Sequence, residues 1–199
     1  MPDPDAWLGG RLPLLDAISL SPAQKTLWDR MDATMGRWAG KTGFDSKTFD
    51  NCFIGPFNPM LRSPDIALTF VQLQMDESKH TSLSDRVRQV VILSVGSVWK
   101  AHYELSAHAA AACHAGFSDT CVEALVAGHI TPEFAADEAI AQRLALVLTA
   151  GHAVDDELFT EALRHFGETG LVDFAVLAGC YHLVCGLLNL FAVPAPRPA

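Results

Sequence analysis

Three histidines, a glutamate, a tyrosine and a cysteine lie close together in the segment 99–116, which reads WKAHYELSAHAAAACHAG. Alanine is the best helix former, and nothing in this segment before Gly116 is typical of a helix end. The sequence therefore predicts one helix that carries all of these groups. Glu104 and His108 are four residues apart, so their side chains share one face of that helix, and Ala111 and Ala112 leave room beside the imidazole.

A carboxylate beside an imidazole suits proton transfer, because it orients the ring and favours its protonated form. The same spacing also occurs in ordinary Glu–His pairs that contribute a few tenths of a kcal/mol to helix stability. Spacing alone leaves both interpretations of Glu104 and His108 open. His102 points away from Glu104, and Cys113 points away from His108. We therefore expect no metal site on this helix alone. A metal could bind only if His102 or His182 joined Glu104 and His108 across helices. We also expect no cofactor.

The composition is typical of one apolar globular domain. The chain has 199 residues, of which 50% are hydrophobic and only 19% are charged, enough for a sizeable core. Its mean hydropathy of +0.20 is high for a soluble monomer and indicates apolar surface buried between subunits. The formal net charge is −9 and no basic stripe is present, so we expect no nucleic-acid partner.

The sequence predicts no membrane partner and a reducing compartment. No signal peptide is apparent, and the longest apolar run, 171–191, is interrupted by polar residues and glycine. The five cysteines are odd in number and none has Cys-x-x-Cys spacing. We therefore expect reduced thiols in a cytoplasmic protein.

Helical periodicity predicts an all-α fold without strands. We expect an N-terminal arm over 1–20, which packs on the body or on a neighbour, a single helical domain over 21–194, and a C-terminal tail over 195–199. Ser21 and Ser84 are typical N-caps, as is Ser118, while Pro64 starts a further helix and Gly167 ends another. Expected helices run from 22 to near 40, then from 64, from 85 to 98, over 99–116, from 119 to 128, over 138–150, from 156 to 167, and over 170–191.

Outside the central helix, the candidate binding residues lie in the long connection 40–63 and in the last helix. Phe57 is expected to form an apolar pocket wall or to fill the core, and Arg62 to pair with an anionic ligand or to be solvated. His182, with Tyr181 and Asn189, is expected to line the pocket, although a buried histidine bonded to a carbonyl is the commoner arrangement. The same choice between pocket and packing applies to two residues of the central segment, His102 and Tyr103.

Two segments resemble a known family. RVRQVVILSV (86–95) and the segment 99–118 are similar to the carboxymuconolactone decarboxylase and alkyl hydroperoxidase D superfamily, whose members pair R-x-R-E-x-x-I-L with Y-E-x-x-x-H-x-x-x-A-x-x-x-G. The similarity extends over residues 50–194. It implies an all-helical alkyl hydroperoxidase D-like fold that assembles as a homotrimer or homohexamer, with pockets near subunit contacts.

The chain departs from the peroxidase branch, which uses Cys-x-x-Cys-x-x-x-His with a glutamate twelve residues before the first cysteine. Aligned on His108, these three positions hold Ala101, Glu104 and Gln89. A thiol peroxidase needs an attacking thiolate and a resolving thiol, so the classical peroxidase activity is not expected.

The decarboxylase branch carries Glu-Leu-x-x-His, which 104–108 match. The resemblance implies that His108 moves the proton and that Glu104 orients it or binds substrate. The expected enzyme is a cofactor-free lyase or isomerase that acts on a small carboxylated or lactone-like compound. Two alternatives stay open: a non-catalytic binding or scaffold oligomer of the same fold, in which helix-to-helix bonds hold Glu104 and His108, and an atypical thiol peroxidase that uses Cys113 or Cys121.

Overall fold

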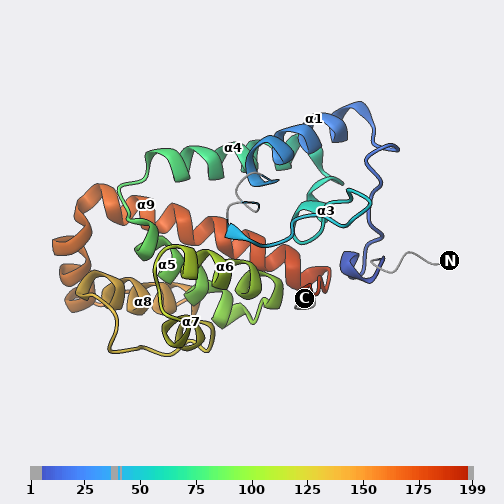
Figure 1. Ribbon diagram of the computed structural model, residues 1–199. Helices are drawn as coiled ribbons and strands as arrows, with labels where there is room; N and C mark the ends of the chain where they lie inside the picture. Colours follow the sequence, from blue (N-terminus) through green and yellow to red (C-terminus); the bar gives the residue numbers. More distant parts are fainter. Residues whose placement is uncertain (1–5, 37–39, 41, 197–199) are drawn as a thin grey trace.

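The computed structural model describes residues 6–36, 40 and 42–196. Figure 1 shows the long helix α9 (Asp156–Leu190) running through the molecule, with α1 (Pro22–Met31) and α4 (Pro64–His80) on one side and α5 to α8 on the other. Apart from an isolated bridge between Lys47 and Phe53, the described residues form no β-structure. The predicted all-α class is confirmed.

Helix α5 (Asp85–Trp99) is the centre of the core. It contacts α6 (His102–His114), α7 (Asp119–Val126), α8 (Ala136–Thr149) and α9. Because these helices surround its middle, its apolar residues between Val87 and Val95 are almost completely buried, which explains a run too dense in Val, Ile and Leu to be amphipathic. Its buried positions include Val90, Val91, Leu93 and Val95.

Several helix boundaries follow the predicted capping residues. Ser21 accepts a hydrogen bond from the backbone of Gln24 in a capping box. Ser84 and Ser118 cap α5 and α7 by accepting from the backbone amides of Val87 and Cys121. After α1, a π-helical turn covers Asp32–Gly36, and the predicted helix end near Gly40 falls beside residues 37–39 and 41, which lie outside the described residues.

The prediction of one helix over 99–116 is wrong at its start. Lys100 adopts a left-handed conformation (φ 52°, ψ 39°), so α5 ends at Trp99 and α6 begins at His102. The amide of Ala101 donates to the carbonyl of Gly96, and that of Lys100 to Ser97, which is the hydrogen-bond pattern of a Schellman motif. A glycine usually holds the left-handed position, and a lysine there gives the sequence no signal of a break.

Helix α9 bends at Gly167, where φ is 67° and ψ is 177°, so the helical segments 156–166 and 168–190 meet at the predicted boundary. By length and composition alone, α9 is apolar enough to cross a membrane, which differs from the expectation from the sequence. A core helix meets the same test, and α9 buries Phe174, Leu177 and Leu188 in the core. One such helix is weak evidence for a membrane span.

The predicted N-terminal arm packs on the body of its own chain. After a 3-10 turn (Ala6–Gly9), the amide of Arg11 donates to the carbonyl of Phe191 at 2.7 Å, and Leu14 and Leu15 contact the core. Residues 1–5 of the arm and 197–199 of the C-terminal tail lie outside the described residues.

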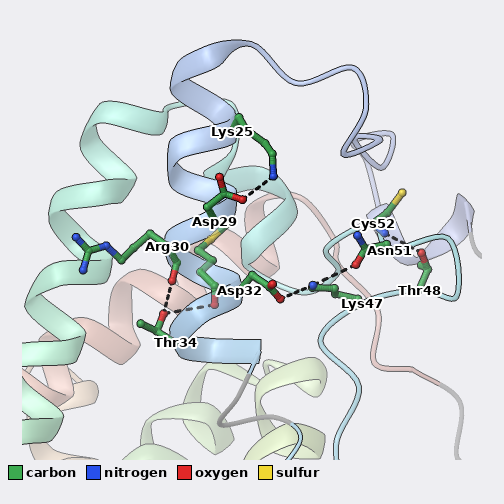
Figure 2. A network of polar contacts seen from close by, with 10 residues as sticks. Lys25, Asp29, Arg30, Asp32, Thr34, Lys47, Thr48, Asn51 and Cys52 are labelled. Atoms are coloured by element: carbon green, nitrogen blue, oxygen red, sulfur yellow. Dashed lines mark hydrogen bonds and ion pairs between the residues drawn. The ribbon is translucent and has the colours of Figure 1, made fainter.

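The connection between α1 and α4 is tied to α1 by a lysine. Figure 2 shows the Lys47 ammonium between Asp32 and Asn51, and the Nζ atom also lies 4.2 Å from the centre of the Trp28 ring. Farther along, the connection forms the short helix α3 (Phe57–Met60) and is buried. This segment is therefore an ordered part of the core.

Candidate functional site

Glu104 and His108 face each other on α6, as their spacing predicts. Glu104 Oε1 lies 3.1 Å from His108 Nε2, and the two residues are only 3% and 5% exposed. Because α6 begins at His102, Glu104 lies in the first turn of the helix, where the partial positive charge of the helix N-terminus favours a carboxylate.

Two neighbouring helices complete the surroundings of the imidazole. On α5, Gln89 places Oε1 2.9 Å from Nδ1 of His108, and on α9 the hydroxyl of Tyr181 lies 3.3 Å from Nε2. The rings of His108 and Tyr181 are perpendicular, with 5.1 Å between their centres. Three helices therefore hold the imidazole.

Burial raises the pKa of the Tyr181 hydroxyl well above its ordinary value, and the nearby Glu104 carboxylate raises it further. Tyr181 is partly exposed as a residue, but its hydroxyl lies against the buried His108. The hydroxyl therefore keeps its proton, so it remains able to donate a hydrogen bond.

One carboxylate oxygen of this cluster is unusual. Glu104 Oε1 is buried and makes no hydrogen bond within the described part of the chain, although it lies within ion-pair distance of His108 Nε2. Buried carboxylate oxygens normally accept hydrogen bonds, because leaving one without a donor costs free energy. A catalytic role is one of the recognised reasons for an unsatisfied buried oxygen.

The same cluster also has features of a structural histidine. Both ring nitrogens of His108 have partners on other helices, and the side chain is buried. This is the arrangement that the scaffold hypothesis predicts, and the unbonded oxygen of Glu104 is the feature that it does not explain.

The structure does not bring the other predicted central residues to the imidazole. His102 is exposed at the first position of α6. Tyr103 is buried with no hydrogen-bond partner for its hydroxyl in the described structure, and burial is the main cause of its raised pKa. The Tyr103 ring packs tightly against Gly55, where an added Cβ would lie 2.2 Å from Cζ of the ring.

The predicted binding residues of the connection make structural contacts. Phe57 is buried, with its ring 5.5 Å from that of Phe53. The guanidinium of Arg62 donates to the backbone carbonyl of Asn58 at 2.7 Å and to the carbonyl of Pro13, so it joins the arm to α3. Burial lowers the pKa of Arg62.

The predicted residues of the last helix bond to neighbouring helices. His182 Nε2 lies 3.0 Å from the hydroxyl of Thr149, and burial lowers the pKa of this histidine. The amide of Asn189 donates to the carbonyl of Trp99 at 2.7 Å. Both contacts join α9 to other helices.

Of the predicted site residues, Glu104 and His108 meet each other, and Gln89 and Tyr181 join them. Sequence reasoning missed Gln89 as a site member and named Tyr181 only as a companion of His182 in the pocket, not as a partner of His108. The signal for Gln89 was its alignment with the upstream glutamate of the peroxidase branch, and that for Tyr181 was its place beside His182.

A hollow of about 420 Å³ lies away from the imidazole. It is lined by residues of the π-helical turn and of the connection that follows: Asp32, Gly36, Gly40, Phe44, Asp45, Ser46 and Lys47. Phe44 also makes an edge contact with Tyr103, with 6.2 Å between ring centres. No predicted site residue lines this hollow.

The cysteines are poorly suited to thiolate chemistry. Among them Cys113 is exposed and the other four are buried. Burial is the largest cause that raises the pKa of Cys113 and Cys121, and it raises that of Cys180 to about 11. Within the described residues, no three His, Cys, Asp or Glu side chains gather closely enough to hold a metal ion.

Comparisons with known proteins bear on the fold. No protein-family model matches the chain, and no curated protein matches it. Among solved structures, an uncharacterized peroxidase-related protein from Silicibacter sp. TM1040 is 17% identical, with a TM-score of 0.72 over 95% of this chain and 93% of that one. The alkylhydroperoxidase AhpD core protein from Ralstonia eutropha JMP134 is 16% identical, with a TM-score of 0.72 over 96% and 93%.

A third similar structure is a cysteine-to-alanine variant of the debrominase Bmp8 in complex with 2,3,4-tribromopyrrole. It is 17% identical to this chain, with a TM-score of 0.69 over 96% of this chain and 92% of that one. At 16–17% identity the similarity concerns the fold alone. It confirms the resemblance found in the two motifs as far as the fold is concerned. The chain has the alkyl hydroperoxidase D-like fold.

Proposed function

We propose that Glu104 and His108 form the proton-transfer site of a cofactor-free enzyme, a lyase or isomerase that acts on a small carboxylated or lactone-like compound. The observation that carries this proposal is the buried Glu104 oxygen, 3.1 Å from Nε2 and without a hydrogen bond. A purely structural pair would gain stability by satisfying that oxygen.

In a decarboxylation, the bond between the substrate's carbon and its carboxylate breaks, and carbon dioxide leaves. The electron pair moves into an adjoining carbonyl or conjugated system and forms an enolate. The imidazolium of His108 then donates its Nε2 proton to carbon, and the Glu104 carboxylate stabilises the imidazolium before that transfer. In an isomerisation, the same nitrogen first removes a proton from carbon and then returns it to a different carbon.

The test is turnover of a panel of carboxylated lactones, beginning with carboxymuconolactone, with detection of carbon dioxide and of deuterium taken up from D₂O. His108→Gln should lower kcat/KM by about 100-fold or more, the usual contribution of a positioned acid or base. His114→Gln, an exposed histidine on the same helix, is the matched control and should keep full activity. Loss of activity together with loss of the oligomer in His108→Gln would not support the proposal.

The second candidate is a non-catalytic binding or scaffold protein, favoured by the two helix-to-helix bonds of His108. It predicts no turnover of the panel by any variant and a large loss of stability in His108→Gln. An atypical thiol peroxidase would instead reduce peroxides and lose that activity when Cys113 and Cys121 are both changed to serine. The raised pKa values of both thiols are unfavourable for it.

We also propose that the chain forms a cytoplasmic homo-oligomer, a trimer or hexamer. Large apolar side chains are exposed on two helices that contact each other: Ile66 and Leu73 on α4, and Val172, Leu183 and Leu190 on α9. Light scattering on the eluting protein should give three or six times the 21.5 kDa chain mass, and a 21.5 kDa particle at micromolar concentration would contradict the proposal.

A further inference from the structure

The two nitrogens of His108 have partners of different chemical character. Gln89 presents its carbonyl oxygen, Oε1, to Nδ1 at 2.9 Å, and an amide oxygen can only accept a hydrogen bond. Nδ1 must therefore carry a hydrogen for this contact to be favourable. At Nε2, the partner is the Tyr181 hydroxyl at 3.3 Å, which can donate or accept.

The two contacts therefore constrain the two nitrogens differently. The Gln89 contact is compatible with one state of Nδ1, the protonated one. The Tyr181 contact is compatible with both states of Nε2, because the hydroxyl can donate to a bare nitrogen and accept from a protonated one. Glu104 Oε1, 3.1 Å from Nε2, can accept a hydrogen bond when Nε2 carries the proton, and must carry the proton itself when Nε2 is bare, so these two atoms are placed to share one proton.

We propose that Gln89 is a positioning residue that keeps a hydrogen on Nδ1 of His108 throughout, and that Nε2, which the Tyr181 hydroxyl can serve in either state, is the nitrogen that gains and loses the proton. The catalytic meaning of this arrangement rests on the proposed function, whereas the tautomer itself does not. Because the carboxamide of Gln89 is uncharged, it selects the nitrogen without adding a negative charge beside the ring. Proton exchange is then confined to the side of the ring that faces Glu104 and Tyr181.

The test is long-range ¹H–¹⁵N NMR of the protein labelled at its histidine side chains, without substrate. The eight histidines are resolved by comparison with His108→Asn, which removes one set of signals. At a pH where the ring is neutral, His108 should show a protonated Nδ1 and an unprotonated Nε2. The opposite tautomer in the wild-type protein would overturn the proposal.

Variants then test the roles of Gln89 and Tyr181. Gln89→Leu removes the acceptor and should lower the ratio of the Nδ1–H to the Nε2–H form by about fivefold, the equivalent of one ordinary hydrogen bond. Gln89→Glu, which keeps an acceptor oxygen, should retain the Nδ1–H form of the wild-type protein. Tyr181→Phe removes a contact that serves both states of Nε2, so it should change the ratio less than Gln89→Leu does.

Tyr103→Phe is the matched control, since Tyr103 and Tyr181 are the two tyrosines of the chain and the Tyr103 hydroxyl has no hydrogen-bond partner in the described structure. It should leave the His108 signals unchanged. Unchanged His108 signals in Gln89→Leu, or a larger shift in Tyr181→Phe than in Gln89→Leu, would overturn the positioning role of Gln89. Failure of the proposed function is a separate result, because it appears as absent turnover whatever the tautomer.

Discussion

Replacing Gly55 by alanine should destabilise the protein in two separable ways. The residue has φ of 65°, a left-handed conformation that costs an L-residue about 1–2 kcal/mol. The added Cβ would also lie 2.2 Å from Cζ and 2.5 Å from the hydroxyl oxygen of Tyr103. Forcing such contact in a packed core costs about 1–3 kcal/mol more, so the total loss for Gly55→Ala is about 2–5 kcal/mol.

Gly151→Ala separates the two contributions. Gly151 has φ of 74°, but no atom lies within 4 Å of its added Cβ, so this variant should lose only the conformational part. Urea unfolding measures the stability of both variants. If their free energies of unfolding differ by about 2 kcal/mol, their urea midpoints should differ by roughly 1 M, at a slope of about 2 kcal/mol per M. Combining Gly55→Ala with Tyr103→Leu should give less than the sum of the single losses.

Equal midpoint shifts for Gly55→Ala and Gly151→Ala would refute the reasoning, because they would mean that Tyr103 moves aside at no cost. The comparison also concerns the candidate site, since Tyr103 immediately precedes Glu104. If the tyrosine is displaced, the first turn of α6 should move with it.

Two further predictions concern charged groups. Arg86→Met should cost about 2–4 kcal/mol in urea unfolding, because it removes the bond from Nε to the Glu138 carboxylate at 2.6 Å and leaves a buried charge. Arg143→Met, whose partner Glu161 is partly exposed, should cost less than about 1 kcal/mol, and similar losses would contradict this ranking. Because burial lowers the pKa of His182, the unfolded chain binds more protons at mildly acidic pH, so stability should fall as pH drops below about 6.5. His182→Gln should show a shallower fall between pH 7 and 5, and an unchanged pH profile would contradict that cause.

Local signals in the sequence predicted most of the helices, since the caps at Ser21, Ser84 and Ser118 and the bend at Gly167 depend on nearby residues. The break at Lys100 left no signal, because a lysine holds a position where glycine is usual.

Only the part of the candidate site that lies on a single helix could be predicted from the sequence. The spacing of Glu104 and His108 set their common face, whereas Gln89 and Tyr181 approach from other helices, at sequence separations of 19 and 73 residues from His108. The contacts of Arg62 with Pro13 and of Asn189 with Trp99 end on backbone carbonyls of distant segments, which side-chain patterns do not reveal.

The left-handed residue at Lys100 has a consequence for how the imidazole acquires its neighbour on α5. If α5 and α6 were one straight rod, Gln89 and His108 would be about 28 Å apart along its axis, at 1.5 Å per residue. The reversal at Lys100 instead folds the second helix back along the first and brings Oε1 and Nδ1 to 2.9 Å. The non-helical backbone at Lys100 and Ala101 thus brings the imidazole and its amide partner together, so two residues of the connection determine whether these groups meet.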